Sequence, residues 1–159
     1  MKKNLIITLI ISLFIISETM LAPPVPDIYY KVITQNNISM TGKNGQTVGS
    51  LGGCNSINAL HIYLKNAPRR MNVKYWVSFC NSGGQIGYNN SVVKSKLRCD
   101  CIKSLQINIE NAPPELKIKY EVTFQNGLKM TAYNGTKVWS PLNCDCIQAL
   151  KVTLEKELP

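Results

Sequence analysis

The sequence contains few of the residue types that enzymes use for acid–base chemistry. Its 159 residues include a single histidine, His61, and nine acidic residues against 18 basic ones. It has no Gly-x-Ser-x-Gly motif and no carboxylate pair with an obvious polar pocket. His61 lies between Leu60 and Ile62, an alternation that is typical of the outer face of a strand. We therefore expect a non-catalytic protein without cofactor or metal ion, in which His61 is a surface residue.

Long apolar runs are also scarce. The main one spans residues 5–16 behind Lys2 and Lys3, and it is shorter than the roughly 20 residues that a membrane-spanning helix needs. This pattern predicts a signal peptide over residues 1–22 and one mature domain over 23–159. An uncleaved membrane anchor remains the alternative, because Pro23 follows the expected cleavage site. We expect the protein to be secreted and to act outside the cell or at the cell surface.

Helical periodicity is absent over any long segment, and a 45-residue repeat takes its place. The three units span about 27–68, 71–113 and 116–156, with Ala67-Pro68 and Ala112-Pro113 at the joints between them. Matching positions carry the same residues without any gap: Tyr30, Tyr75 and Tyr120; Asn44, Asn89 and Asn134; Val48, Val93 and Val138; Cys54, Cys99 and Cys144; Leu60, Leu105 and Leu150.

Each unit has the pattern of several short strands. It opens and closes with runs in which apolar and polar residues alternate, which indicates half-buried strands. Asn44-Gly45 and Asn134-Gly135 suit two-residue hairpin turns, since both residues tolerate a positive φ angle. Each unit has one apolar face that it cannot bury alone, so three units should pack about a pseudo-threefold axis. We predict an all-β fold that is β-prism-like or β-trefoil-like. The prism is slightly favoured, because each unit looks like a self-contained antiparallel meander.

The cysteines suggest a disulfide set, because six of them follow a signal peptide. They are Cys54, Cys80, Cys99, Cys101, Cys144 and Cys146. The one-residue spacing of Cys99 and Cys101 differs from that of zinc knuckles, so we expect no metal site. Successive residues of a strand point to opposite faces, so these two should not pair with each other. Six cysteines allow 15 connectivities, and the sequence does not choose among them. A bridge from Cys80 to Cys101 or to Cys146 would join the two strands that flank a unit or its neighbour.

Candidate binding residues lie at the turns and among the nearby aromatic residues. Sugars stack on aromatic rings and form hydrogen bonds with amides. The candidates are Asn44, Trp76, Tyr88, Asn89, Tyr133, Asn134 and Trp139. The alternative for each aromatic residue is that it fills a gap in the core. Asn37, Asn89 and Asn134 also begin tripeptides that match the N-glycosylation pattern.

The three units resemble a known family, the clostridial hydrophobic repeat with a conserved tryptophan (ChW repeat). The resemblance is carried by Tyr30-Lys31-Val32, Gln35-Asn36, Asn44-Gly45-Gln46, Gly49-Ser50 and the run Ile57-Asn58-Ala59-Leu60-His61-Ile62-Tyr63-Leu64. The Gly-Trp pair of that family is replaced here by Asn37-Ile38, Ser82-Gly83 and Gly127-Leu128. The resemblance implies a secreted or surface-attached adhesive module that binds sugars.

The charge of the chain bears on its partners. Its formal net charge is +9, which favours anionic partners such as surface polymers or acidic glycans. Secretion argues against nucleic acid. We therefore expect a non-catalytic adhesive or carbohydrate-binding module whose partner is an extracellular glycan or surface polymer. A secreted effector or inhibitor that binds a protein, with contacts through Arg69, Arg70 and Lys74, and a structural coat component are the alternatives.

Overall fold

The computed structural model describes residues 25–53 and 55–157; the predicted signal peptide (1–22) and Cys54 lie outside them. These residues form twelve strands, and they include no helix long and apolar enough to cross a membrane. The first repeat forms β1 (Asp27–Thr34), β2 (Ser39–Lys43), β3 (Val48–Gly49) and β4 (Ile57–Lys65). The second forms β5 (Asn72–Phe79), β6 (Gly84–Tyr88), β7 (Val92–Lys94) and β8 (Ile102–Glu110). The third forms β9 (Leu116–Phe124), β10 (Lys129–Tyr133), β11 (Val138–Trp139) and β12 (Ile147–Lys156).

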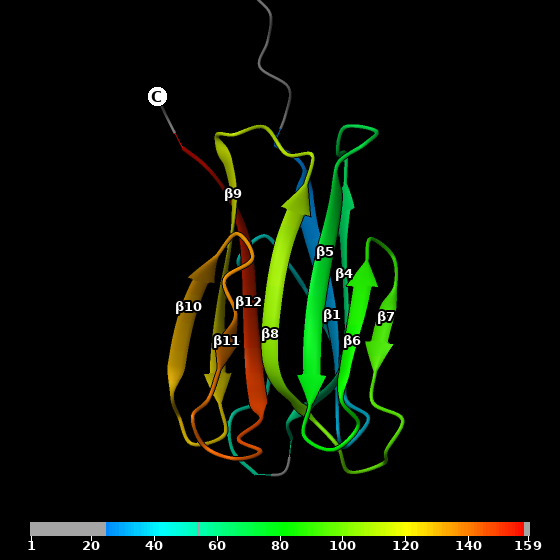
Figure 1. The fold of residues 1–159 in the computed structure, drawn as a ribbon, viewed down its shortest axis with the longest axis vertical. Coiled ribbons are helices and arrows are strands. Elements are labelled where there is room, and N and C mark those ends of the chain that lie inside the picture. Colours follow the sequence, from blue (N-terminus) through cyan, green and yellow to red (C-terminus); the bar gives the residue numbers. More distant parts are fainter. Residues whose placement is uncertain (1–24, 54, 158–159) are drawn as a thin grey trace, which may run out of the picture.

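The twelve strands form three antiparallel sheets of four strands, and each sheet contains one strand from another repeat. The first sheet has the order β2-β1-β4-β7, the second β11-β8-β5-β6 and the third β10-β9-β12-β3. Each repeat therefore keeps three strands and gives its short third strand to the sheet of another repeat, in a closed cycle. Figure 1 shows the strands running along the long axis of the molecule. The predicted all-β, threefold fold is confirmed, and it is prism-like. The expectation of self-contained units was wrong.

The apolar faces of the three sheets pack together along the axis. The strands alternate between buried and outward residues as the sequence predicts, for example in β9. Tyr30, Tyr75 and Tyr120 hold matching positions in the core, with at most 1% of each side chain exposed. Each hydroxyl group donates a hydrogen bond to a backbone carbonyl beyond the hairpin turn of its own repeat. The repeat gives each unit the same apolar face, and these three faces bury one another around the axis.

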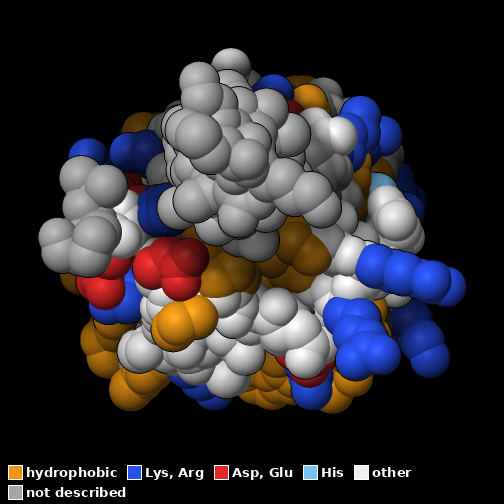
Figure 2. All heavy atoms as spheres, turned by 90° about the horizontal axis from the view of Figure 1, so that it is seen from above, with side chains coloured by type: hydrophobic (Ala, Val, Ile, Leu, Met, Phe, Trp, Pro, Cys, Tyr) orange, Lys and Arg blue, Asp and Glu red, His pale blue; other side chains and the backbone are white. Residues whose placement is uncertain are grey.

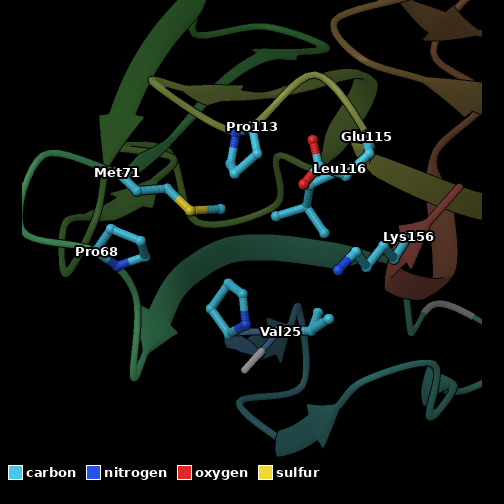
Figure 3. A pocket seen from close by; sticks show the side chains of 8 residues that line it. Val25, Pro68, Met71, Pro113, Glu115, Leu116 and Lys156 are labelled. Carbon is cyan, nitrogen blue, oxygen red and sulfur yellow. The ribbon is translucent and has the colours of Figure 1, made fainter. Parts of the chain in front are cut away.

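The joints between the repeats meet at one end of the molecule. Pro26, Met71 and Leu116 are equivalent by the repeat, and all three line one small cavity of about 40 Å³. Figure 3 shows Met71 and Leu116 pointing into this space beside Pro68 and Pro113. Figure 2, which looks down on this end, shows apolar side chains near its centre and basic side chains grouped on one side. The loops that follow the short third strands lie at the opposite end.

A β-bulge occurs at the same place in every repeat. The register shifts where Ile33 and Thr34 pair with Ala59 and Ile57, which leaves Asn58 as the extra residue. Lys103 and Gln148 are the extra residues of the second and third sheets. A bulge redirects side chains and is often found beside binding sites. The three bulges therefore turn equivalent residues toward the loops at the same end of the prism.

Candidate functional site

The outer face of the second sheet carries both tryptophans of the chain. Trp76 lies on β5 and Trp139 on β11, and β8 separates these two strands. Trp76 pairs with Gln106 of β8, and Trp139 pairs with Ser104 of the same strand. The two tryptophans come from different repeats and from positions that are not equivalent. Strand exchange brings them onto one face.

A hollow of about 450 Å³ lies beside Trp76. The indole packs against Gly84, where an added Cβ would lie 3.1 Å from the ring, so the glycine leaves room for it. The ammonium nitrogen of Lys137 lies 4.7 Å from the ring centroid, within cation–π distance. The amides of Gln106 and Asn108 line the same hollow. An aromatic ring and two amides therefore meet at one place on the surface.

A second hollow of about 230 Å³ adjoins Trp139, whose side chain is 53% exposed. Lys137 lines this hollow as well as the one beside Trp76, so the two hollows are neighbours. Together they form a continuous region across β11, β8 and β5, which we call the tryptophan face. Tyr88 extends it on the edge strand β6, where Lys74 lies 5.6 Å from the tyrosine ring.

The predicted turn asparagines hold the fold instead of pointing toward this face. The side-chain oxygens of Asn44 and Asn134 accept the backbone N–H groups of Ile28 and Ile118, at 2.8 and 2.9 Å. The side-chain oxygen of Asn89 accepts the N–H of Leu64 at 2.7 Å. Both residues of the Asn44-Gly45 and Asn134-Gly135 turns have positive φ angles, as the sequence predicts. In the corresponding turn of the second repeat, Asn90 has a positive φ angle and Asn89 does not. This difference accompanies the different partner of the Asn89 side chain, which accepts from Leu64 of the first repeat.

The remaining aromatic candidate, Tyr133, lies on β10 of the third sheet and is 42% exposed. The first sheet carries a cluster that the sequence prediction missed, in which the rings of Tyr29 and Tyr63 stack with centroids 5.3 Å apart. His61 stacks on Tyr63 at 4.9 Å. Burial lowers the pKa of the His61 imidazole, and the charge of Lys31 lowers it further. Trp76, Tyr88 and Trp139 thus share a face, and the other candidates lie elsewhere.

Sequence reasoning also missed the polar part of the tryptophan face. Gln106 and Asn108 were not selected, although their alternation with Leu105 and Ile107 in β8 already places both amides on the outer face. Lys137 could not be placed from sequence, because its neighbourhood depends on which sheet β11 joins. The available signal was therefore the alternation within β8, combined with an aromatic residue on its partner strand.

The aspartates between the cysteines organise loops. The carboxylate of Asp100 is fully buried and accepts the N–H groups of Asn81, Ser82 and Cys101 at 2.9–3.0 Å. It also accepts the hydroxyl groups of Ser82 and Ser95, at 2.6 and 2.8 Å. Burial alone would raise the pKa of Asp100, but these hydrogen bonds outweigh it and lower the pKa. Asp145 holds its loop with fewer bonds, from the N–H of Asn126 and the hydroxyl of Ser140.

One disulfide closes the loop end of the prism. It joins Cys101 to Cys146, which hold the same position in two repeats and whose Cα atoms are 5.9 Å apart. Equivalent residues this close to each other must lie near the axis that relates them. The sulfur of Cys80 lies 3.6 Å from each of these two sulfurs. The disulfide therefore joins the two cysteines that the sequence offered as partners of Cys80.

The other described cysteines take no part in a disulfide. Cys80 is half-buried, while Cys99 and Cys144 are exposed. Cys99 does not pair with Cys101, as the strand geometry predicts. Burial raises the pKa of the Cys80 thiol to about 12, and the neighbouring Cys144 adds to this effect. Cys80 is therefore a neutral thiol beside the disulfide at ordinary pH.

Comparison with known proteins gives no relative. No family model matches the chain, and neither the curated proteins nor the solved structures contain a significant match. The functional argument therefore depends on the surfaces of the prism.

The three outer faces have diverged although the core positions repeat. Equivalent positions carry Lys31, Trp76 and Glu121 on the opening strands, and His61, Gln106 and Lys151 on the closing strands.

Proposed function

We propose that the protein is a secreted, non-catalytic carbohydrate-binding module and that the tryptophan face is its binding surface. The observation that carries this proposal is the presence of Trp76, Trp139 and two outward amides on one face. Aromatic rings offer a flat apolar surface to the C–H face of a sugar, and amides exchange hydrogen bonds with its hydroxyl groups. Lys137 covers the ring of Trp76, and its long side chain can move aside when a sugar stacks there.

Secretion is supported by the sequence and by the disulfide. Lys2 and Lys3 precede the apolar run 5–16, as in a signal peptide. The buried Cys101–Cys146 disulfide is of the kind that persists in oxidising compartments.

The divergence of the three outer faces argues for a binding function and against a structural coat. A purely structural coat component would gain nothing from a single face rich in tryptophan. An adhesive role at a cell surface, as the ChW resemblance implies, fits one binding face on a rigid prism.

The proposal is tested by screening the purified protein on a glycan array and measuring the best ligand by titration calorimetry. Trp76→Ala and Trp139→Ala should each weaken binding by about 2 kcal/mol, or roughly 30-fold, as expected for buried aromatic contacts. Trp76→Phe should keep most of the affinity, because it preserves a stacking ring. Tyr133→Ala is the matched control, since this exposed aromatic residue lies on the third sheet.

High salt separates this function from simple attraction to a basic surface. Stacking and hydrogen bonds to a neutral glycan should survive 1 M salt, where the Debye length is only about 3 Å. Binding that disappears in high salt and ignores both tryptophans would contradict the proposal. No binding, together with capture of a protein partner that Arg69→Ser/Arg70→Ser/Lys74→Ser abolishes, would favour the effector alternative.

A further inference from the structure

A further pocket lies at the loop end of the prism, where the first sheet meets the loop of the second repeat. Its volume is about 480 Å³, and it lies apart from the tryptophan face. The turn after β1 supplies Gln35 and Asn37, and the bulge of β4 supplies Asn58. Residues 94–98 form the opposite wall. They comprise Lys94, the last residue of β7, and the first four residues of the loop that follows it. We call this space the bulge pocket.

Hydrogen bonds hold the walls of the bulge pocket in place. The amide of Gln85 bonds both backbone groups of Lys94, at 2.8 and 3.2 Å. The N–H of Ser95 donates to the carbonyl oxygen of Asn58 at 3.1 Å, which ties the loop to the bulge. The hydroxyl of Ser95 donates to the buried carboxylate of Asp100. The pocket is therefore preorganised, which lowers the cost of ordering it around a ligand.

The charge of the pocket is one-sided. Lys94, Lys96 and Arg98 all line it, and each is exposed to solvent. None of the described residues that line it is acidic. Three cationic groups on five consecutive residues raise the local concentration of anions. An arginine among them offers paired donors that match a carboxylate or sulfate group.

A buried amide oxygen without a hydrogen-bond partner gives the second, independent indication of a ligand. The Asn58 side chain lines the pocket and is only 6% exposed, and its oxygen has no hydrogen-bond partner among the described residues. Leaving such a group unsatisfied costs about 1–3 kcal/mol. Bulges place polar residues beside binding sites, and Asn58 is the bulged residue of β4.

At the equivalent position of the third sheet, the fold itself supplies the hydrogen bonds of an amide side chain. There, the side chain of Gln148 accepts the N–H of Gly52 and donates to the carbonyl of Gly53, both at 3.0 Å. Asn58 is one methylene shorter, and its facing loop carries Leu97 and Arg98 in place of the two glycines. The pocket beside Asn58 thus remains open, while the equivalent amide in the third sheet is bonded to its loop.

We propose that the bulge pocket binds an acidic saccharide. The carboxylate or sulfate group of the sugar pairs with Lys94, Lys96 and Arg98, and one of its hydroxyl groups bonds the amide of Asn58. A hydroxyl group both donates and accepts, so it completes the amide whichever way the amide is turned. This site is separate from the tryptophan face, and it does not depend on sugar stacking there.

The probe is trigalacturonic acid, and the control ligand is its methyl ester, which keeps the sugar rings and hydroxyl groups but has no charge. Protein made in a bacterial host avoids a glycan on Asn37, which also lines the pocket. Titration calorimetry should show saturable binding of the acid and at least about tenfold weaker binding of the ester. Equal affinity for the two ligands would overturn the proposal.

Two variants locate the binding. Lys96→Ser/Arg98→Ser should weaken binding of the acid at least about tenfold, while Arg69→Ser/Arg70→Ser, which removes the same charge from the joint end, should change it less than about twofold. Equal losses in the two double variants would reduce the effect to net charge and overturn the site.

Asn58→Leu separates a ligand contact from a structural role. Because it removes an unsatisfied buried amide, the thermal midpoint should stay the same or rise, while affinity for the acid falls at least about fivefold. A large loss of stability with unchanged affinity would mean that Asn58 is structural. Trp76→Ala should leave binding of the acid unchanged. The results that would contradict sugar binding at the tryptophan face therefore differ from those that would contradict acid binding in the bulge pocket.

Discussion

The phenol oxygen of Tyr75 accepts a hydrogen bond from the backbone N–H of Ile62, at 3.3 Å, across the boundary between the second and first repeats. The same hydroxyl donates to the carbonyl of Ser91 in its own repeat. The hydroxyl groups of Tyr30 and Tyr120 donate to carbonyl groups at the equivalent positions. Each tyrosine thus supplies core volume and a hydrogen bond to its own hairpin, and Tyr75 also links two repeats.

Replacing Tyr75 by phenylalanine should destabilise the protein by about 1–2 kcal/mol, because the carbonyl of Ser91 and the N–H of Ile62 lose a buried partner. Urea unfolding should show a lower midpoint with an unchanged slope. Tyr88→Phe removes the same hydroxyl from a side chain that is 46% exposed and should change the midpoint little. Equal effects of the two substitutions would contradict the role of the buried hydroxyl.

Stability should fall in alkaline solution. Burial raises the pKa of Tyr75 to about 12 from the ordinary value of 10.0, and burial also raises the pKa values of Tyr30 and Tyr120. The folded state keeps these protons longer than the unfolded chain, so the stabilisation is complete below pH 10 and is lost as the pH rises through about 12. Thermal unfolding from pH 9 to 12 should show this decline, and Tyr75→Phe should show less of it. A decline of the same size in both proteins would mean that other groups cause it.

Asp100→Asn should cost about 3 kcal/mol, because the carboxylate accepts five hydrogen bonds within a buried loop. Asp145→Asn should cost less, since that carboxylate accepts two hydrogen bonds, from Asn126 and Ser140. The first repeat carries Asn55 at this position, so the fold tolerates an amide there. Chemical denaturation of the two variants measures the difference, and a larger loss in the Asp145 variant would contradict it.

The carboxylate of Asp100 should also account for part of the loss of stability in acid. Because the pKa of folded Asp100 lies below the ordinary value of 3.8, its stabilisation is present above pH 3.8 and is lost as the pH falls through the lowered value. The wild type should therefore lose more stability than Asp100→Asn does between pH 5 and pH 2. Parallel acid profiles for the two proteins would show that other carboxylates control unfolding.

Loss of the disulfide should be partly repaired by Cys80. The Cys101–Cys146 bond closes a separation of 45 residues, which corresponds to about 4 kcal/mol in the chain-entropy treatment. In Cys101→Ser, oxidised glutathione should join Cys80 to Cys146, because their sulfurs already lie 3.6 Å apart. Peptide mapping should detect this bond, and the double variant Cys80→Ser/Cys101→Ser should be less stable than the single one. A free Cys146 in the single variant would contradict the prediction, and Cys99→Ser serves as the control.

The sequence was sufficient for the strands and for the threefold arrangement, because both follow from local patterns. Alternation in β9, and in β4 from Leu60 on, predicted which residues are buried, and the Asn44-Gly45 pair predicted its hairpin turn. The exchange of the third strands could not be predicted. Segments as short as β3 and β11, with two residues each, carry no pattern that favours the sheet of their own repeat over that of a neighbour.

The candidate site was only partly predictable for the same reason. Trp76 and Trp139 occupy different positions of the repeat, so the 45-residue period does not relate them. Only the pairing of β11 with β8 puts Trp139 on the face that Trp76 occupies. Asn44 and Asn134 were chosen because turns are exposed, but their side-chain oxygens are engaged by the backbone. The unpartnered amide oxygen of Asn58 depends on a bulge and on the distance from that bulge to the facing loop, which are three-dimensional properties.

The cyclic exchange of β3, β7 and β11 means that no single repeat can complete its own sheet. A peptide that contained one repeat would have an uncovered edge on its closing strand and a strand with nothing to pair with. Three such peptides would have to exchange their third strands, as the three repeats of this chain do, before each sheet had its fourth strand. Val25 and Lys156 line the same cavity, which places the two ends of the described chain together. The two ends could therefore be linked and the chain reopened at either of the other joints between repeats, as in a circular permutation.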